Sequence, residues 1–410
     1  MNDFISIKQR LFPNNYELID GTNEVFELNI ALWEFENLSE LELIKRSGFF
    51  KQINGIDTAH YRLCNLQRID EIYKNSTFRT RLFFTNGKYS TGYATHNLFP
   101  YRGKFHPQMI KGLLNIIDIK ENEIVLDPMA GSGTLMVEAN LLNINAIGVD
   151  LSPFCQLMSR VKTHSLSINI NRLDNLYKKQ FEIFNILNQK KIPHNYLNEI
   201  NIEDYIYYEI FLLAYLDAMG FARRSKKNID NLYPIVIERY YRTIRNFNLA
   251  RNDLELNIGT SKVLLGNALN LDIPDNSVDG VITSPPYSFA IDYIDNDQPQ
   301  LEYLNYDISS LKIDMIGLRG KGINEKLKLY FNDVQESIKE MARVTKKDRR
   351  IVIIIGSNTI QTRGVELQPE IIRIAKIENL TLEMEIKKPI KGLRSSMKEE
   401  SILIFKNNKE

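Results

Sequence analysis

Apolar and polar positions alternate in blocks along the middle of the chain. The apolar run 123-EIVLD-127 predicts a buried strand, 132-SGTLMVEANLLN-143 has helical spacing, and 145-NAIGVD-150 predicts a second strand. A further helix is predicted before them, over 108–117. A strand, a helix and a strand at this spacing form the βαβ unit of a parallel sheet.

The same alternation returns near the C-terminal end after a long interruption. Residues 165–255 are rich in Asn, Lys, Ile and Tyr and indicate a mostly helical insertion. Strands are then predicted at 261–265, 278–283 and 351–356, with a helix over 326–344, and the runs 380–386 and 401–405 suit an antiparallel pair. We therefore expect one doubly wound α/β domain, formed by residues 96–164 and 256–410, that carries the insertion.

Residues 1–95 differ from the rest and predict a small α+β domain that has a possible role in substrate recognition. The stretch 24-EVFELNIALWEF-35 is interpreted as a strand, and 38-LSELELIKRSGF-49 as a helix that stops at Gly48. Strand-like pieces such as 81-RLFFTN-86 follow.

Composition narrows the class of protein. The chain has 410 residues and a net charge of +1, so any binding of nucleic acid must come from local basic patches. Two cysteines exclude a disulfide framework and a multi-cysteine metal site, and the five histidines lack metal-ligand spacing. No signal peptide or membrane span is predicted, and the composition is typical of a cytoplasmic protein.

The segment 127-DPMAGSGT-134 places a glycine-rich turn between a strand and a helix. Glycines let a ligand approach the backbone closely, and the helix N-terminus offers free N–H groups. The turn is neither a P-loop nor the usual GxGxxG motif. Asp150 ends the next strand, where an acid in a nucleotide-binding βαβ unit reaches ribose hydroxyls.

The segment 283-TSPPY-287 follows the apolar run 278-VDGVI-282. Two consecutive prolines fix the backbone and donate no hydrogen bonds, so they end the strand. What remains is a rigid turn with free carbonyls, a hydroxyl and an aromatic ring, which suits a planar, polar ligand.

DPMAGSGT, Asp150 and TSPPY, in this order, resemble the motifs of S-adenosylmethionine-dependent amino-methyltransferases, and the SPPY form is most similar to the DNA cytosine-N4 enzymes. The resemblance implies a class I methyltransferase sheet, which is Rossmann-like, with S-adenosylmethionine as cofactor. It also implies that 102-RGKFHPQM-109 is the upstream cofactor motif and that Asn267 lies near the adenine, where the family usually has an acid. The implied cofactor-binding residues are Phe105, His106, Pro107, Asp127, Pro128, Gly131, Ser132, Gly133, Thr134, Asp150 and Asn267.

The resemblance also assigns roles in the transfer of the methyl group. Ser284 and the Pro285 carbonyl would accept hydrogens from the exocyclic amine, Pro285 and Pro286 would hold them rigid, and Tyr287 would stack on a flipped base. Carbon-5 methylation is disfavoured because it needs a cysteine nucleophile, and Cys155 is predicted to be a buried small hydrophobe. His106 is predicted to be structural rather than catalytic.

Residues 220–251 carry basic and aromatic side chains that suit a phosphate backbone and exposed bases. A solvated helical face with aromatics turned to the core is the alternative interpretation. The predicted nucleic-acid contacts are Arg223, Arg224, Lys226, Lys227, Arg239, Arg242 and Arg245.

Four functions stay open at this point. The first is methylation of cytosine N4 in double-stranded DNA, in a restriction–modification or similar system with a cognate endonuclease as possible partner. The second is an RNA target, because the FELNIALWEFENLSELELI segment loosely resembles tRNA guanosine-N2 methyltransferases, although Ser284 favours DNA. Adenine N6 is the third target, and a catalytically silent DNA-binding subunit is the fourth.

Overall fold

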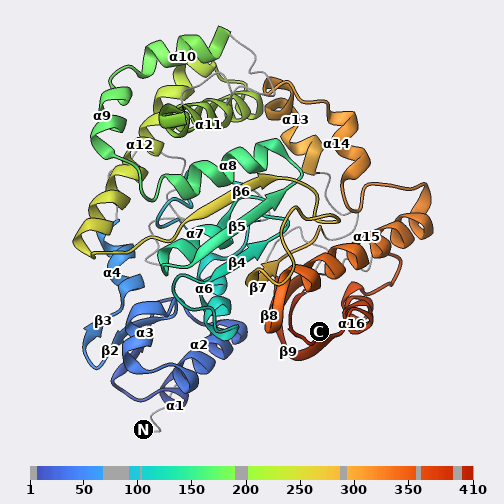
Figure 1. Ribbon diagram of the computed structural model, residues 1–410. Helices are drawn as coiled ribbons and strands as arrows, with labels where there is room; N and C mark the ends of the chain where they lie inside the picture. The colour runs from blue at the N-terminus through green and yellow to red at the C-terminus, as the bar shows by residue number, and fades with distance from the viewer. Residues whose placement is uncertain are drawn as a thin grey trace, which may run out of the picture.

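A computed structural model of the protein describes residues 7–67, 92–101, 104–189, 202–286, 293–356, 362–390 and 399–409. Its centre is a seven-stranded sheet in the order β6-β5-β4-β7-β8-β10-β9 (Figure 1). The strands parallel one another except β10, which is antiparallel to both β8 and β9. They are β4 Ile124–Asp127, β5 Asn145–Asp150, β6 Ser261–Leu265, β7 Val278–Thr283, β8 Thr345–Gly356, β9 Leu380–Pro389 and β10 Glu399–Asn407.

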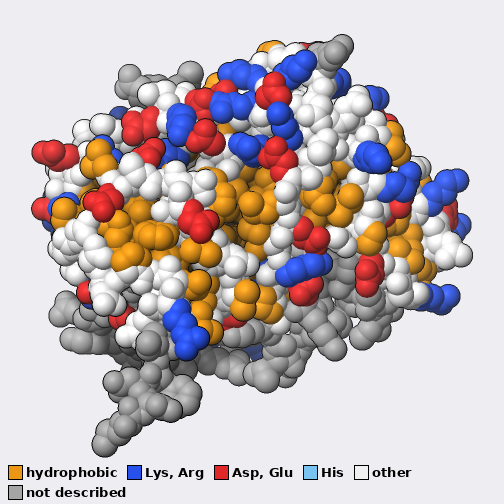
Figure 2. Space-filling model, turned by 90° about the horizontal axis from the view of Figure 1, so that it is seen from below, with side chains coloured by type: hydrophobic (Ala, Val, Ile, Leu, Met, Phe, Trp, Pro, Cys, Tyr) orange, Lys and Arg blue, Asp and Glu red, His pale blue; other side chains and the backbone are white. Residues whose placement is uncertain are grey.

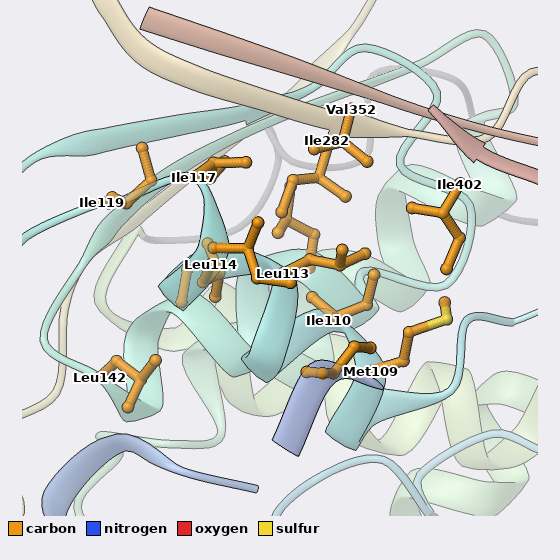
Figure 3. Packing of buried hydrophobic residues seen from close by; sticks show 14 of the residues in the cluster. Met109, Ile110, Leu113, Leu114, Ile117, Ile119, Leu142, Ile282, Val352 and Ile402 are labelled. Carbon is orange, nitrogen blue, oxygen red and sulfur yellow. The ribbon is translucent and has the colours of Figure 1, made fainter. Parts of the chain in front are cut away.

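Helices cover both faces of this sheet, as a doubly wound α/β fold requires. The central strand β8 alternates, with Val352 and Ile354 in the core under α6 and α7, and with Ile351 and Ile353 in the core under α15 and α16. Figure 3 shows α6 side chains directed toward Ile282, Val352 and Ile402 of the sheet. The predicted Rossmann-like fold is confirmed, and these helices are α6 Pro107–Ile116, α7 Thr134–Leu141, α8 Pro153–His164, α15 Gly322–Val344 and α16 Leu367–Ile377.

The described part of the insertion is helical, as predicted, and lies above the sheet in Figure 1. It shares a buried core with α8, through Phe154, Leu157 and Met158, and with the segment that follows β7. No helix within the described ranges is long and apolar enough to cross a membrane. The helices of this layer are α9 Ile170–Tyr177, α10 Gln180–Gln189, α11 Ile202–Ser225, α12 Ile229–Asp253, α13 Tyr293–Tyr303 and α14 Ile308–Asp314.

The N-terminal region is α+β, but the strand predicted at 24–35 is wrong, because this segment is the helix α2. A capping box between Glu24 and Glu27 starts the helix, and Phe26 and Ile30 face the core. The three strands form an antiparallel sheet in the order β1-β2-β3, and residues 81–86 lie outside the described ranges. The elements are α1 Ile7–Leu11, β1 Tyr16–Leu18, α2 Val25–Asn37, α3 Glu40–Arg46, β2 Phe50–Ile53, β3 Ile56–Asp57 and α4 Ala59–Leu66.

The N-terminal region and the sheet domain share one core. Phe26 and Ile30 of α2 belong to the same buried cluster as Ile110 of α6. Beside it, Asn115 of α6 donates to Glu34 at 2.7 Å and accepts from Arg46 at 2.9 Å. Hydrophobic and polar contacts thus fix α6 against this region, and the domain boundary at residue 95 stays a prediction.

A buried polar cluster links the segment before α6 to α7. Glu138 of α7 accepts a hydrogen bond from Tyr93 at 2.7 Å and pairs with His96 at 2.7 Å, and Lys111 lies 3.5 Å away. Burial alone would raise the pKa of Glu138, but Lys111, His96 and Tyr93 outweigh it and lower the pKa to about 2. The cluster therefore fixes the position of α7 behind the glycine-rich turn.

A second buried ion pair connects the sheet domain to the insertion. Arg160 of α8 donates from Nη2 to Glu209 of α11 at 2.6 Å and from Nε at 3.1 Å, and both side chains are buried. A buried carboxylate that loses its cation is left uncompensated in a medium of low polarity.

We predict that Arg160→Ala lowers the free energy of unfolding by about 3–5 kcal/mol, because it leaves Glu209 buried without its cation. Urea denaturation measures this. The exposed pair of Lys339 and Glu336, 3.4 Å apart, provides the control, and Lys339→Ala should cost less than about 1 kcal/mol. Equal losses for the two variants would contradict the role given to the buried pair.

Candidate active site

The candidate site lies at the point in the sheet where the order of the strands reverses. From β4 the chain runs to β5 on one side, while β7 lies on the other side of β4. A crevice forms at the carboxyl ends of strands at such a switch point. Here Thr283, which ends β7, donates its hydroxyl to Asp127, which ends β4, at 2.8 Å. The two motifs predicted from the sequence, the glycine-rich turn and the Ser–Pro–Pro turn, are therefore joined at their starts.

The glycine-rich turn depends on backbone that other residues rarely adopt. Gly131 and Gly133 have φ of 50° and 75°, and Gly133 caps the N-terminus of α7. A Cβ on Gly133 would lie 2.9 Å from the Ser159 hydroxyl, which itself donates to the Gly131 carbonyl. Ser132 and Thr134 are buried in the turn. The turn thus packs tightly on α8 at Gly133, while Gly131 lines the cavity described below.

Asp150 supports this turn from the end of β5. Its carboxylate accepts from the Gly131 amide at 2.7 Å and from the Ser152 amide at 2.8 Å. Burial raises the pKa of Asp150 to about 6, against the two amide hydrogen bonds that lower it. The side chain thereby couples the ends of β4 and β5.

Both turns open into one cavity with an empty volume of about 850 Å³, including the part open to solvent. Six predicted site residues line it: Pro128, Gly131, Asp150, Asn267, Ser284 and Pro286. Asn267 also accepts from the Leu269 amide at 3.0 Å, which orders the turn after β6. The sequence therefore predicted both walls of this cavity.

The lining of the cavity is acidic. Asp150, Asp297 and Asp314 contribute carboxylates, whereas none of the described lining residues is Lys or Arg. Asp297, in α13, accepts from the Tyr101 hydroxyl at 3.3 Å. Burial raises the pKa of Asp297 to about 7, the Tyr101 hydrogen bond lowers it, and the charge of Asp150 raises it. Such a lining favours a ligand that carries positive charge.

The described part of the predicted upstream motif leads into α6. His106 caps α6, since the Met109 amide donates to its Nδ1 at 3.4 Å, and burial lowers the pKa of His106 to about 4. Pro107 is the first residue of that helix. Phe105, His106 and Pro107 do not occur among the described lining residues. Their contact with a cofactor stays a prediction.

The remaining predicted catalytic residues differ in how they are placed. Pro285 is buried between Ser284 and Pro286, which are partly buried, and Tyr287 lies outside the described residues. Cys155 is buried, as predicted, but it also lines the cavity. Burial raises the pKa of its thiol well above the usual value, so the group stays protonated near neutral pH. A protonated thiol is a poor nucleophile.

The predicted basic residues of the insertion fall into two groups. Arg239 forms an ion pair with Asp217, and Arg242 forms one with Glu238, so these two guanidinium groups have partners within the protein. Exposed basic side chains form the other group: Arg223, Arg224, Lys226, Lys227 and Arg245.

The aromatic residues interleaved with these cations are mostly turned inward. Tyr233, Tyr240 and Phe247 are buried, and Tyr241 stacks on Tyr177 with ring centroids 4.0 Å apart. The suggestion that this segment stacks bases is therefore wrong for the three buried rings, because they pack in the core.

Sequence reasoning missed several residues of the cavity. Tyr101 and Asp297 are 196 positions apart, and only folding brings them together. Ile316 lines the cavity from the segment after α14. The one signal for these residues in the sequence was Asp297 itself, an acid 13 positions after Ser284. Over the described ranges, no cluster of three or more His, Cys, Asp or Glu side chains could hold a metal ion.

Asp127 is a buried acid at the contact between the ends of β4 and β7. Its Oδ1 accepts from the Met129 amide and the Thr283 hydroxyl, whereas Oδ2 is buried without a hydrogen-bond partner among the described residues. Burial raises the pKa of Asp127 from 3.8 to about 7, against those two hydrogen bonds. The folded protein therefore holds a proton here that the unfolded chain releases, and stability falls as pH rises through this window.

We predict that the free energy of unfolding of Asp127→Asn increases relative to that of the unaltered protein as pH rises from 3.8 to about 7, because Asn cannot ionise. Denaturation at pH 5 and pH 8 gives the difference in unfolding free energy. Glu138→Gln is the control. The pKa of Glu138 is lowered to about 2, so its charge stabilises the fold at both pH values and its loss should destabilise the protein at both. A pH-independent difference for Asp127→Asn would contradict the prediction.

Comparison with known proteins shows which families the chain is similar to. A model described as DNA methylase matches residues 31–160, which include the upstream motif, the glycine-rich turn and Asp150. The chain is 25% identical over 274 residues to the Type II methyltransferase M.BsoBI of Geobacillus stearothermophilus, covering 53% of this chain and 54% of that one. It is 23% identical over 382 residues to the Type II methyltransferase M.MjaII of Methanocaldococcus jannaschii, covering 64% and 72%.

The name of a further relative describes an enzyme that modifies tRNA. The tRNA (guanine(10)-N2)-dimethyltransferase of Methanocaldococcus jannaschii is 26% identical over 217 residues, covering 50% of this chain and 57% of that one. The chain thus spans little more than half of this relative and of the first one. S-adenosylmethionine is the cofactor that these matches support, as the sequence motifs implied. The chain is therefore similar to the DNA amino-methyltransferases, with a weaker similarity to the tRNA guanosine-N2 methyltransferases.

Proposed function

We propose that the protein is an S-adenosylmethionine-dependent DNA methyltransferase that modifies the exocyclic N4 amine of cytosine. The observation that carries the proposal is the joining of the glycine-rich turn and the Ser–Pro–Pro turn at one acid-lined cavity. One wall suits a cofactor and the other suits an amine, and the two are held together by the contact between Asp127 and Thr283.

The cofactor would occupy the wall formed by β4, β5 and the turn after β6. Asp150 would accept hydrogen bonds from the ribose, and Asn267 would lie near the adenine. Asp127, with one buried oxygen that no described residue satisfies, would bind polar hydrogens of the cofactor. The acidic lining fits a cation, and S-adenosylmethionine supplies an electrophilic methyl group on a positively charged sulfur.

The target amine would lie against the other wall. The lone pair of an aromatic amine is delocalised into the ring, so acceptors on its hydrogens favour a tetrahedral nitrogen and free the lone pair. Ser284 and the Pro285 carbonyl would act as these acceptors, held rigid by Pro285 and Pro286. Tyr287 would stack on a base flipped out of the duplex. Attack on the methyl carbon is then direct and needs no cysteine.

Duplex DNA would be gripped in part by the exposed basic quartet Arg223, Arg224, Lys226 and Lys227. Arg223 and Arg224 lie in the last turn of α11, and Lys226 and Lys227 follow that helix. Helix α13, which lines the cavity, contacts α11 through the hydrogen bond from Gln300 to the Leu216 carbonyl at 3.5 Å, and this contact supports a role of the quartet near the target wall. The face seen in Figure 2 mixes acidic with basic side chains and offers no comparable basic field among its described residues.

Two other targets have specific support. Methylation of guanosine N2 in tRNA is supported by the similarity to the tRNA dimethyltransferase. Adenine N6 has the same amine chemistry, and only the SPPY form of the target motif favours cytosine. A role in a restriction–modification system, with a cognate endonuclease and a cytoplasmic location, is part of the proposal and follows from the Type II relatives.

Incubation of the protein with S-adenosylmethionine and either duplex DNA or tRNA tests the function. Mass spectrometry of the nucleosides should give N4-methylcytosine from DNA. N6-methyladenine or N2-methylguanosine would support the alternatives, and a protein that binds DNA but neither binds nor consumes the cofactor would be a silent recognition subunit.

We predict that Ser284→Ala lowers the single-turnover rate of methylation by roughly 10²–10³-fold while cofactor affinity stays within about threefold, because one preorganised acceptor is removed. Quenched-flow methylation and calorimetry measure the two quantities. Ser277→Ala is a matched control, since its hydroxyl donates to the Pro274 carbonyl in a turn before β7. A fully active Ser284→Ala enzyme would contradict the role given to the Ser284 hydroxyl and would leave the Pro285 carbonyl as the acceptor from this turn.

We predict that replacing Arg223, Arg224, Lys226 and Lys227 by Gln weakens DNA binding and reduces the slope of log K against log salt by about 0.9 for each phosphate that the protein no longer neutralises. Fluorescence anisotropy over a salt series measures both effects. The control changes four other exposed cations to Gln and alters the net charge equally: Lys339, Lys347, Arg373 and Lys376. Equal effects of the two sets would mean that the quartet is only a solvated face.

A further inference from the structure

One acid of the cavity, Asp297, has no role in the chemistry assigned to the two turns. It lies in the second turn of α13, the helix that follows the Ser–Pro–Pro turn along the chain. Its side chain lines the same cavity as Gly131 and Asp150 on the cofactor wall and as Ser284 on the target wall. It is therefore a carboxylate that faces both halves of the proposed reaction.

The surroundings of Asp297 give it no cationic partner from the described cavity wall. Tyr101 donates its hydroxyl at 3.3 Å and is held in turn by Cys155 of α8, whose thiol lies 3.6 Å from that hydroxyl. The other acids that line the cavity are Asp150 of β5 and Asp314 of α14. A partly buried carboxylate among acids and neutral donors gains most from a ligand with positive charge.

Tyr101 also relates Asp297 to the glycine-rich turn. Its ring lies 4.0 Å from the position that a Cβ on Gly131 would occupy. Tyr101 therefore links Asp297 to the turn against which the methionine part of the cofactor would lie, and Asp150, at the proposed ribose site, lines the same cavity. The sulfur joins those two parts of S-adenosylmethionine.

We infer that Asp297 is the counter-ion of the cofactor's sulfonium centre and remains beside the positive charge as that charge moves to the target amine. This inference rests on the proposed function. During transfer the nitrogen lone pair forms a bond to the methyl carbon, the carbon–sulfur bond breaks, and sulfur keeps its electron pair. Positive charge therefore leaves sulfur and appears on nitrogen, and the amine then loses one proton to solvent.

A counter-ion of the sulfonium distinguishes the cofactor from its product. S-adenosylhomocysteine has the same adenine, ribose, ammonium and carboxylate but a neutral sulfur. Contacts of Asp150 and Asn267 would contribute equally to both dissociation constants. The ratio of the two constants therefore isolates the effect of the charge on sulfur. Asp297 should favour the cofactor, which also promotes release of the product after each turnover.

Calorimetric titration of Asp297→Asn with both ligands tests the inference. We predict that the dissociation constant for S-adenosylmethionine rises about tenfold or more, whereas that for S-adenosylhomocysteine changes less than about threefold. Glu302→Gln is the matched control, because Glu302 is an exposed acid of the same helix that does not occur among the described lining residues, and it should leave the ratio within about twofold. A thermal melt of each variant shows that the fold is retained.

The unaltered protein gives a second test that needs no substitution. Burial and Asp150 raise the pKa of Asp297 to about 7, so its charge is present above this pH and is lost below it. The preference for S-adenosylmethionine over S-adenosylhomocysteine should therefore fall between pH 8 and pH 6. Asp150, with a pKa of about 6, contacts the part common to both ligands and affects both affinities alike.

The outcomes separate the inference from the proposed function. If both ligands bind and Asp297→Asn weakens them equally, or if the ratio is independent of pH, Asp297 is not the counter-ion although the protein still binds the cofactor. If neither ligand binds the unaltered protein, the proposed function fails and the inference fails with it.

Discussion

The hydrogen bond from Thr283 to Asp127 is the contact on which the site depends. It joins the ends of β4 and β7, the two strands at which the order of the sheet reverses, and each strand leads directly into one wall of the cavity. Gly280 lets the segment after α6 pack closely on β7, because a Cβ there would be 2.7 Å from the Ile119 side chain. The sheet thus determines the spacing between cofactor and target before any loop is considered.

Two buried carboxylates, Glu138 and Asp127, differ in the direction in which their surroundings shift the pKa. Glu138 is fully buried, but the charge of Lys111 and the hydrogen bonds of His96 and Tyr93 lower its pKa to about 2. Asp127 is buried to the same degree without a cation among the described residues, and its pKa rises to about 7. The difference is the presence of a partner, since burial acts on both groups in the same direction. Asp150 and Asp297 at the cavity also have raised pKa values, and so does Glu34 between α2 and α6, which is hydrogen-bonded by the neutral Ser47 and Asn115.

The sequence predicted the sheet and both turns because these features depend on local patterns: apolar runs of strand length, glycines between a strand and a helix, and two prolines after a strand. It failed where the pattern was ambiguous or the contact was distant. Residues 24–35 are apolar enough for either a strand or a helix, and the capping box of Glu24 and Glu27 decided for the helix. The contact between Tyr101 and Asp297 could not be predicted from local patterns, since it depends on how α13 packs on α8.

That packing explains what the helical insertion contributes to the site. Phe154 and Leu157 of α8 share a core with α11 and α12, and Ile294 and Leu301 of α13 belong to the same core. The sheet therefore builds the wall proposed for the cofactor, whereas the insertion supports the helix that carries Asp297 into the cavity lining. Because α13 begins only a few residues after the Ser–Pro–Pro turn, the insertion can shape the pocket for the base without disturbing the strands that hold the cofactor. A change of target within such a fold then requires changes in the insertion and α13, while the glycine-rich turn stays as it is.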